Sequence, residues 1–296
     1  MRTAETSMTV LRTLGLTRYF GGLAAVKDVS LECRIGSVHA VIGPNGAGKT
    51  TLINMLSGDL APSAGQVILG ERDITGLAAH RISKLGIGRS YQKTNVFLPF
   101  TAFENCRLAA QSRLRSSMRF FRPALRNREV NAAAERALAA AGLEGRGAVP
   151  VAALSHGEQR QVEIAMALAT DPSVLLLDGP LAGMGAAESA RIVELVKKLA
   201  GDHAILLVEH DMDAVFAVAD RLTYWTSLLP KATRCSVWGK GFSMISTCTF
   251  TSSMNRGNGI HPRSSPSRTL SQAGRRRSVI STTSMRPSVT IGSTST

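Results

Sequence analysis

The chain has 296 residues, of which 44% are hydrophobic, so it can bury a sizeable core and is not disordered throughout. Its formal net charge is +14, but residues 224–296 hold 10 Lys and Arg and no Asp or Glu, which leaves 25 basic and 21 acidic residues in residues 1–223. The charge therefore gives little reason to expect that the body of the protein binds nucleic acid.

Four cysteines without a CxxC pair indicate neither a disulfide framework nor a zinc site, and a reducing cytosol fits them best. The first residues lack the unbroken apolar segment of a signal peptide. No stretch approaches the roughly 18 apolar residues that a membrane-spanning helix needs. We expect a protein that is neither secreted nor integral to a membrane.

Residues 10–70 alternate apolar and polar side chains, as from Ser30 to Ile35, and this pattern predicts strands. A continuous apolar strand from Val38 to Ile42 then leads into a glycine-rich loop. The loop is followed by a predicted helix from Lys49 to Ser57, which Gly58 closes.

From about residue 102 to residue 169 the pattern is helical. One helix, closed by Gly142, has apolar residues three and four positions apart: Val130, Ala134, Ala137, Leu138 and Ala141. The block is rich in arginine, which indicates either a solvated helical face or a docking face for a partner or for anionic lipid. These arginines are Arg107, Arg113, Arg115, Arg119, Arg122, Arg126 and Arg128.

Residues 170–223 alternate strands and helices. Val174 to Asp178 and Ala204 to Val208 are short apolar runs, typical of strands buried on both faces of a parallel sheet. Glu188 to Leu199 is a predicted helix, and Asp211 is a suitable N-cap for another helix from Met212 to Ala219. The alternation predicts a doubly wound α/β sheet.

The last 73 residues, 224–296, differ from the body. They contain 27 Ser and Thr, no carboxylate and both tryptophans of the chain. They lack helical periodicity, and the composition predicts disorder.

Residues 43–50 match the phosphate-loop pattern G-x-x-x-x-G-K-[ST], with an apolar strand before it and a helix after it. Backbone N–H groups of such a loop bind phosphate oxygens, and the helix N-terminus adds a partial positive charge. Lys49 is expected to contact the β- and γ-phosphates, and the Thr50 hydroxyl to hold Mg²⁺. Asp178 ends a strand, where it is either a simple cap or a second magnesium ligand, and the phosphate loop favours the ligand.

Leu154, Ser155, His156, Gly157 and Glu158 open a helix 18 residues before the strand that ends in Asp178. Ser155 and Glu158 alone fit a capping box. Taken with the spacing to the two nucleotide motifs, this segment resembles the LSGGQ-type signature of ABC transporter ATPases. The resemblance covers roughly residues 8–223.

Residues 19–26 and 180–184 make the ATP-binding subunit of branched-chain amino acid importers the most similar subgroup, with urea and amide importers as close alternatives.

The resemblance implies a phosphate-loop α/β fold with an antiparallel β subdomain and an inserted helical subdomain. The nucleotide-binding core would span residues 8–95 and 166–223, the helical subdomain residues 96–165, and the aberrant tail residues 224–296. ATP and Mg²⁺ are the implied cofactors.

The resemblance also implies roles for individual residues. Phe20 and Val26 would contact adenine, with Tyr19 as the neighbouring candidate; Gln92 would touch the metal; and His210 would contact the γ-phosphate. The signature would bind the ATP of a second subunit, through the Ser155 hydroxyl and the Gly157 backbone. The full ATP-binding set is Phe20, Val26, Gly43, Pro44, Asn45, Gly46, Ala47, Gly48, Lys49, Thr50 and Thr51, with Thr50, Gln92 and Asp178 at the metal.

The implied partners are a second ATP-binding subunit, identical or different, two transmembrane permease subunits and, indirectly, a periplasmic solute-binding protein. No nucleic acid is expected. The implied location is cytoplasmic, at the inner face of the plasma membrane.

The sequence departs from the family at Gly179, where the family has the glutamate that polarises the attacking water. A positioned general base contributes about 10²–10⁴ in rate, so we expect the chain to bind MgATP but to hydrolyse it poorly. Glu209 is a candidate replacement that the sequence does not place at the water. A nucleotide-gated dimerising module without turnover is the alternative function, and a damaged gene product without function stays open.

A second departure begins after Thr223, where the family continues with strands and helices. The abrupt change is typical of out-of-frame translation of a GC-rich gene; a genuine basic tail that binds anionic lipid or nucleic acid is the rival hypothesis. Either way we expect an uncovered sheet edge and poor solubility. A soluble ABC-type ATPase of nucleic-acid metabolism is a further alternative, but it would usually have a duplicated or interrupted nucleotide domain.

Overall fold

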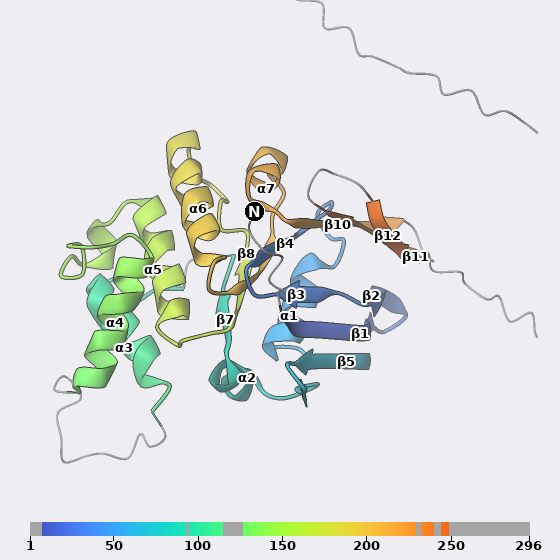
Figure 1. The fold of residues 1–296 in the computed structure, drawn as a ribbon, viewed down its shortest axis with the longest axis horizontal. Helices are drawn as coiled ribbons and strands as arrows, with labels where there is room; N and C mark the ends of the chain where they lie inside the picture. Colours follow the sequence, from blue (N-terminus) through green and yellow to red (C-terminus); the bar gives the residue numbers. More distant parts are fainter. Residues whose placement is uncertain (1–7, 93–94, 115–126, 229–231, 240–243, 249–296) are drawn as a thin grey trace, which may run out of the picture. The chain divides into compact units, whose positions relative to one another are not determined.

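The computed structural model describes residues 8–92, 95–114, 127–228, 232–239 and 244–248. Its central element is a seven-stranded sheet with the order β12-β11-β10-β4-β9-β8-β7. From β10 to β7 neighbouring strands are parallel, whereas β11 and β12 are added antiparallel (Figure 1). The strands are β4 (Ser37–Ile42), β7 (Ile87–Ser90), β8 (Val174–Asp178), β9 (Ala204–Val208), β10 (Arg221–Leu228), β11 (Ala232–Gly239) and β12 (Met244–Cys248).

Both faces of this sheet are covered, as the apolar runs predict. Leu176 and Leu206 lie in a core that includes α1 (Lys49–Ser57), whereas Leu175 and Leu207 belong to a second core. The second core includes residues of α6 (Ala186–Leu199) and α7 (Met212–Val218). Successive strand residues thus alternate between two cores, and the doubly wound prediction is confirmed.

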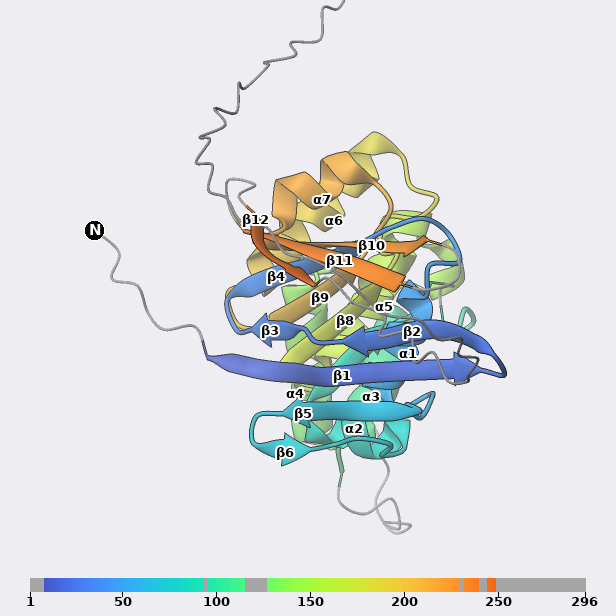
Figure 2. The same cartoon turned by 90° about the vertical axis from the view of Figure 1, so that its right-hand side faces the viewer.

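A second, antiparallel sheet of five strands supplies the predicted β subdomain (Figure 2). Its strands pair in the order β2-β1-β5-β6, with β3 added to β1. They are β1 (Thr9–Phe20), β2 (Leu23–Val29), β3 (Glu32–Arg34), β5 (Ala64–Leu69) and β6 (Arg72–Asp73). The short helix α2 (Ala79–Leu85) leads from this sheet to β7.

The third part is a group of helices with a core of its own, which includes Cys106, Ala134, Leu138 and Val162. It comprises α3 (Ala102–Gln111), α4 (Arg128–Ala140), the 3₁₀ turn η2 (Val151–Ala153) and α5 (His156–Leu168). These helices fall largely within the range predicted for the helical subdomain, although α5 runs three residues further. Of the arginine-rich block, Arg115, Arg119, Arg122 and Arg126 lie outside the described residues.

Among the described residues no helix combines the length and the apolar character needed to cross a bilayer.

The expectation of disorder from residue 224 onward is wrong for part of the tail. Strand β10 continues to Leu228, and β11 and β12 extend the sheet, so β10 has a neighbour on each side. The physical reason is local: Thr223, Tyr224 and Trp225 are strong strand formers, and Trp225 is fully buried in the core. The described strand β11 covers β10, so the uncovered edge expected from the loss of strands after Thr223 is not at β10; poor solubility stays a prediction. Residues 249–296 lie outside the described residues.

His39, on β4, makes the stability of this sheet depend on pH. Its Nδ1 lies 2.9 Å from the Glu32 carbonyl oxygen, which can only accept, so the neutral ring donates there and its Nε2 accepts from the Thr223 hydroxyl at 2.8 Å. Burial, together with the charge of Arg221, lowers the pKa of His39 to about 4. The unfolded chain, with a His pKa near 6.5, therefore takes up this proton first as the pH falls.

Above about pH 6.5 we expect the contribution of His39 to the free energy of unfolding to be independent of pH. Between pH 6.5 and 4 the free energy of unfolding should fall by about 3 kcal/mol because of this residue. Denaturant unfolding of the wild type and of His39→Gln across this range measures the difference. The exposed His80 provides the control variant His80→Gln, which should keep the wild-type slope. Equal slopes for wild type and His39→Gln would contradict the assignment.

Candidate functional site

The phosphate loop connects the end of β4 to the start of α1, as predicted. Its closing residue, Gly48, has φ +99°, and a Cβ placed on it would lie 2.2 Å from the Ala25 carbonyl oxygen. A Cβ on Gly43 would lie 2.2 Å from the carbonyl oxygen of Trp225. The loop is therefore held between β2 and β10, and both contacts require glycine.

Lys49 carries the positive charge of the loop. Its Nζ donates to the carbonyl oxygens of Gly43 at 2.7 Å and Pro44 at 2.9 Å. Partial burial lowers the pKa of Lys49, and the nearby Asp178 carboxylate opposes this shift. The ammonium group is thus fixed within the loop, next to the first turn of α1, whose free N–H groups also favour anions.

A cavity of about 400 Å³ lies over the loop and brings together residues from separate segments of the chain. Eleven of the predicted residues line it: Asn45, Gly46, Ala47, Gly48, Lys49, Thr50, Thr51, Gln92, Asp178, Gly179 and His210. Ala25, Val208 and Glu209 also line it. Its volume lies within the range of small-molecule sites, and phosphate-binding and carboxylate groups converge on it.

Asp178 fits the role of a metal ligand. It ends β8, is 3% exposed, and its Oδ2 is a buried atom that accepts no hydrogen bond from the described residues. The Arg89 Nη2 atom lies 3.9 Å from it, close enough to attract but too far to bond. Burial raises the pKa of Asp178, while Arg89, Arg160 and Lys49 oppose the shift.

The donor set suits a hard cation. Among the described residues there is no cluster of three or more His, Cys, Asp and Glu side chains that would hold a metal by itself. The cavity instead offers one carboxylate, the Thr50 hydroxyl and the Gln92 amide, oxygen donors that Mg²⁺ accepts beside phosphate oxygens and water.

Gly179 occupies the wall of the cavity beside Gln92. It has φ +59°, and its N–H donates to the Val208 carbonyl oxygen at 2.8 Å. A Cβ on Gly179 would meet the Gln92 Cγ at 3.6 Å and the Ala182 Cβ at 3.9 Å, which are ordinary contacts. The position has space for a Cβ, and the chain places no carboxylate there.

Glu209 lines the same cavity, but its carboxylate already holds two backbone groups. Oε1 accepts from Leu181 N at 2.7 Å and Oε2 from His210 N at 3.1 Å. Burial raises the pKa of Glu209, and these hydrogen bonds oppose the shift. The His210 side chain is 70% exposed, with Nδ1 3.5 Å from Glu209 Oε2. Glu209 thus positions the segment that carries His210.

The signature segment does not line this cavity. Ser155 caps α5, its Oγ accepts from Glu158 N at 3.3 Å, and Glu158 Oε2 accepts from Ser155 N at 2.9 Å. The capping box that the sequence allowed as an alternative is therefore present. Gly157 lies close to Glu188, since a Cβ on it would be 3.1 Å from Glu188 Oε1.

The two predicted adenine contacts differ in exposure. Phe20, at the end of β1, is 48% exposed, and the Arg18 guanidinium lies 5.0 Å from the centre of its ring. Val26 is fully buried beneath Gly48, so its side chain supports the loop instead of facing solvent. Neither lines the cavity, and both adenine contacts stay predictions.

Two alanine substitutions within the loop distinguish the effect of a steric clash from that of backbone strain alone. We expect Gly48→Ala to abolish ATP binding, because the new Cβ collides with the Ala25 carbonyl and displaces the loop. Gly46→Ala is the control, since φ is also positive, at +78°, but nothing lies within 4 Å of the added Cβ. Equilibrium titration with ATP measures both; equal affinities for the two variants would contradict the steric account.

Comparison with known proteins agrees with this geometry. The family model of the ABC transporter matches residues 26–182. The LivG branched-chain amino acid transport ATP-binding protein of Salmonella typhimurium is 38% identical over 225 residues, covering 73% of this chain and 88% of its own length. BraF of Pseudomonas aeruginosa is 37% identical over 223 residues, with the same coverage.

Solved structures give the same result. A nucleotide-free ATP-binding cassette from an ABC transporter superposes with a TM-score of 0.66 at 30% identity, covering 73% of this chain and 87% of that chain. A dimeric, ADP- and phosphate-bound cassette, MJ0796, has a TM-score of 0.61 at 28% identity, covering 72% and 93%. The chain therefore belongs to the ABC transporter family, and it is similar to branched-chain amino acid transport ATP-binding proteins over most of its length.

Proposed function

We propose that this chain is the ATP-binding subunit of an importer and binds MgATP in the cavity over the phosphate loop. The observation that carries the proposal is the convergence of Lys49, Thr50, Gln92, Asp178 and His210 on one cavity. Branched-chain amino acids are the proposed solute class, supported by the similarity to LivG and BraF. Urea or amide import is the alternative within the same class of transporter.

In this proposal different residues bind the phosphates and the metal, according to their chemical groups. Loop N–H groups and Lys49 bind the phosphates, while Thr50, Gln92 and Asp178 hold the metal. Mg²⁺, when bound, neutralises charge on the phosphate oxygens. His210 would contact the γ-phosphate, and the hydrogen bond from the His210 N–H to Glu209 supports this role by holding the backbone of His210.

A second ATP-binding subunit completes the site in this proposal. The N-terminus of α5, with Ser155 and Gly157, does not line its own chain's cavity, which supports its use on a partner's ATP. The dimeric state named for the similar cassette MJ0796 is consistent with this arrangement. The partner is a second copy or a related subunit that supplies its own glutamate.

The permease would dock where the helical group meets the core. A cavity of about 330 Å³ lies there, lined by residues of α2, β7, α3 and α5 and of the segment after β7. Its lining residues include His80, Tyr91, Ala109 and Met166. Tyr91 directly precedes Gln92 in the sequence, so a docked membrane subunit would be close to the metal-binding segment. This supports a location at the cytoplasmic face of the membrane, with a solute-binding protein as an indirect partner.

Gly179 favours a second function for the same site. Without a carboxylate at this position, ATP would drive association of two subunits without appreciable turnover, and the chain would act as a nucleotide-gated dimerising module. Both versions require ATP binding, and they differ only in hydrolysis.

Equilibrium titration of the full chain with ATP tests the shared part of the proposal. Wild type should bind, and Lys49→Ala should lose most of the affinity because the phosphates lose their fixed cation. Lys84→Ala, in the last turn of α2, is the matched control and should bind like wild type. Absence of binding by the folded wild-type chain would refute the proposal.

A further inference from the structure

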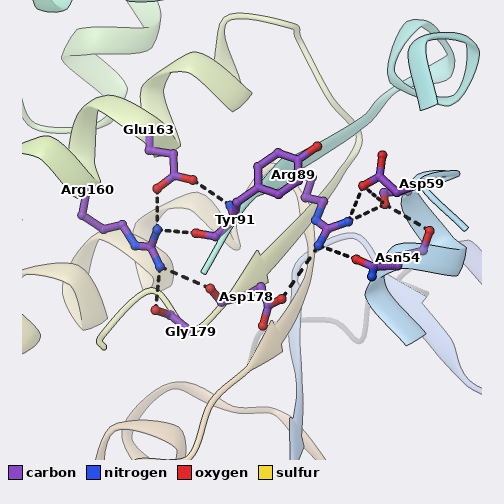
Figure 3. A network of polar contacts seen from close by, with 9 residues as sticks. Asn54, Asp59, Arg89, Tyr91, Arg160, Glu163, Asp178 and Gly179 are labelled. Atoms are coloured by element: carbon purple, nitrogen blue, oxygen red, sulfur yellow. Dashed lines mark hydrogen bonds and ion pairs between the residues drawn. The ribbon is translucent and has the colours of Figure 1, made fainter. Parts of the chain in front are cut away.

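A buried arginine on α5 reaches the ends of two neighbouring parallel strands. Arg160 is 2% exposed, and its Nη2 donates to the carbonyl oxygens of Gly179 at 2.6 Å and Asp178 at 3.2 Å (Figure 3). Its Nη1 donates to the Tyr91 carbonyl oxygen at 2.5 Å and to Glu163, one turn further along α5. A single guanidinium thus joins the segment after β7 to the end of β8.

Glu163 completes the contact with Tyr91. One of its oxygens pairs with Arg160, and Oε1 accepts from Tyr91 N at 2.6 Å. Both backbone groups of Tyr91 are therefore bonded to side chains of α5, in the way that a neighbouring strand would bond them. Glu163 is 4% exposed, so neither charge of the pair is shared with solvent.

The backbone held in this way directly adjoins the proposed metal ligands. Gln92 follows Tyr91 in the sequence. Arg160 also donates to the carbonyl oxygens of Asp178 and Gly179, and so holds the backbone that carries the Asp178 side chain. The Asp178 Oδ2 atom accepts no hydrogen bond from the described residues, so its direction depends on this backbone and on Arg89 at 3.9 Å. The capping residue of helix α5, Ser155, lies five residues before Arg160.

We propose that Arg160, paired with Glu163, is a positioning residue that aligns Gln92 and Asp178 for Mg²⁺ and ties both ligands to the helix that begins at the signature. A movement of α5 when the signature engages a partner's nucleotide would reach both ligands through one side chain. Only arginine can do this, because its planar fork points donors toward several acceptors at once, whereas lysine has a single ammonium group. This inference rests on the proposed binding of MgATP.

The test measures the affinity of the full chain for a non-hydrolysable ATP analogue with Mg²⁺ and with EDTA. Wild type should bind more tightly with Mg²⁺. Arg160→Lys should lose about tenfold or more of that Mg²⁺-dependent gain, the range seen when groups that orient metal ligands are changed, while the affinity in EDTA stays within about twofold. Electron paramagnetic resonance of Mn²⁺ bound with the nucleotide should show weaker binding of the ion.

Two further variants keep the test decisive. Glu163→Gln has the same shape and retains one acceptor, so it should fold and lose part of the gain even if Arg160→Lys does not fold. Arg146→Lys changes the exposed partner of Glu158 near the start of the same helix and should behave like wild type.

A full Mg²⁺-dependent gain in a folded Arg160→Lys or Glu163→Gln variant would overturn the inference. So would an equal loss with Mg²⁺ and with EDTA, which would make Arg160 a purely structural residue. If wild type binds the analogue equally with and without Mg²⁺, the metal assignment fails together with the inference; if it does not bind at all, the proposed function itself fails.

Discussion

Replacing Gly179 by glutamate should raise steady-state ATP turnover of the full-length chain by about 10²–10⁴-fold, the contribution of a positioned general base. An added Cβ makes only ordinary contacts there, since it would lie 3.6 Å from Gln92 Cγ. The left-handed backbone, φ +59°, costs a residue with a Cβ about 1–2 kcal/mol. The rate gain corresponds to about 3–5 kcal/mol of the reaction barrier, whereas the backbone cost is subtracted from the stability of the folded chain.

Gly179→Gln is the matched control, because it carries the same backbone cost and nearly the same volume without a base. It should turn over ATP no faster than wild type. Turnover by wild type that already equals that of Gly179→Glu would contradict the account and would point to another base. If neither protein turns over ATP while both bind it, the need for a partner subunit outweighs the missing carboxylate.

Replacing Trp225 by alanine should destabilise the protein by about 3–5 kcal/mol, the usual cost of removing a buried aromatic side chain. Trp225 is fully buried in the core shared with α1, and its backbone contacts Gly43 at the start of the phosphate loop. The same change should therefore also weaken ATP binding. Chemical denaturation followed by circular dichroism gives the stability, and ATP titration gives the affinity.

The neighbouring residue supplies the control for this prediction. Tyr224 lies on the same strand but is 45% exposed, so Tyr224→Ala should change stability by far less. Its backbone pairs with Ile42, a pairing that the substitution leaves in place. Similar losses of stability for the two variants would contradict a specific role for the buried Trp225 side chain under the phosphate loop.

The central parts of the fold could be predicted because their signals are local. Fully apolar runs such as Val174 to Leu177 became buried parallel strands, and Gly58 and Asp211 end and begin helices as expected. The phosphate loop combines glycines, a lysine and its flanking elements within one short segment of the chain. Its position at the end of β4 therefore followed from the sequence alone.

Other parts of the site could not be predicted because they depend on distant contacts. Ala25 and Trp225 support the loop through their carbonyl oxygens, which any residue type could supply. Arg160 and Glu163 are ordinary helix residues in the sequence, and only the fold brings them to Tyr91, which lies far earlier in the chain. Glu209 drew attention as a possible base, but the backbone contacts that occupy its carboxylate were not visible in the sequence.

At the start of the tail, side-chain packing stabilises a strand that the amino-acid composition did not predict. A change in composition at residue 224 predicted loss of structure, yet Trp225 fills the core and β10 continues to Leu228. A shift of reading frame near residue 223 stays a hypothesis for the origin of the tail. Translation of the other two frames beyond this codon tests it, and it fails if neither frame yields a strand-turn-strand continuation.

The claim that MgATP closes a dimer which the chain does not reopen by hydrolysis is tested most directly by sedimentation velocity. The full-length protein should be monomeric without nucleotide and dimeric with MgATP, and the dimer should persist over hours in the absence of a partner subunit. A monomer at saturating MgATP would contradict the account. A dimer that returns to monomer as ATP is converted to ADP would contradict it equally, because it would show turnover without a carboxylate at position 179.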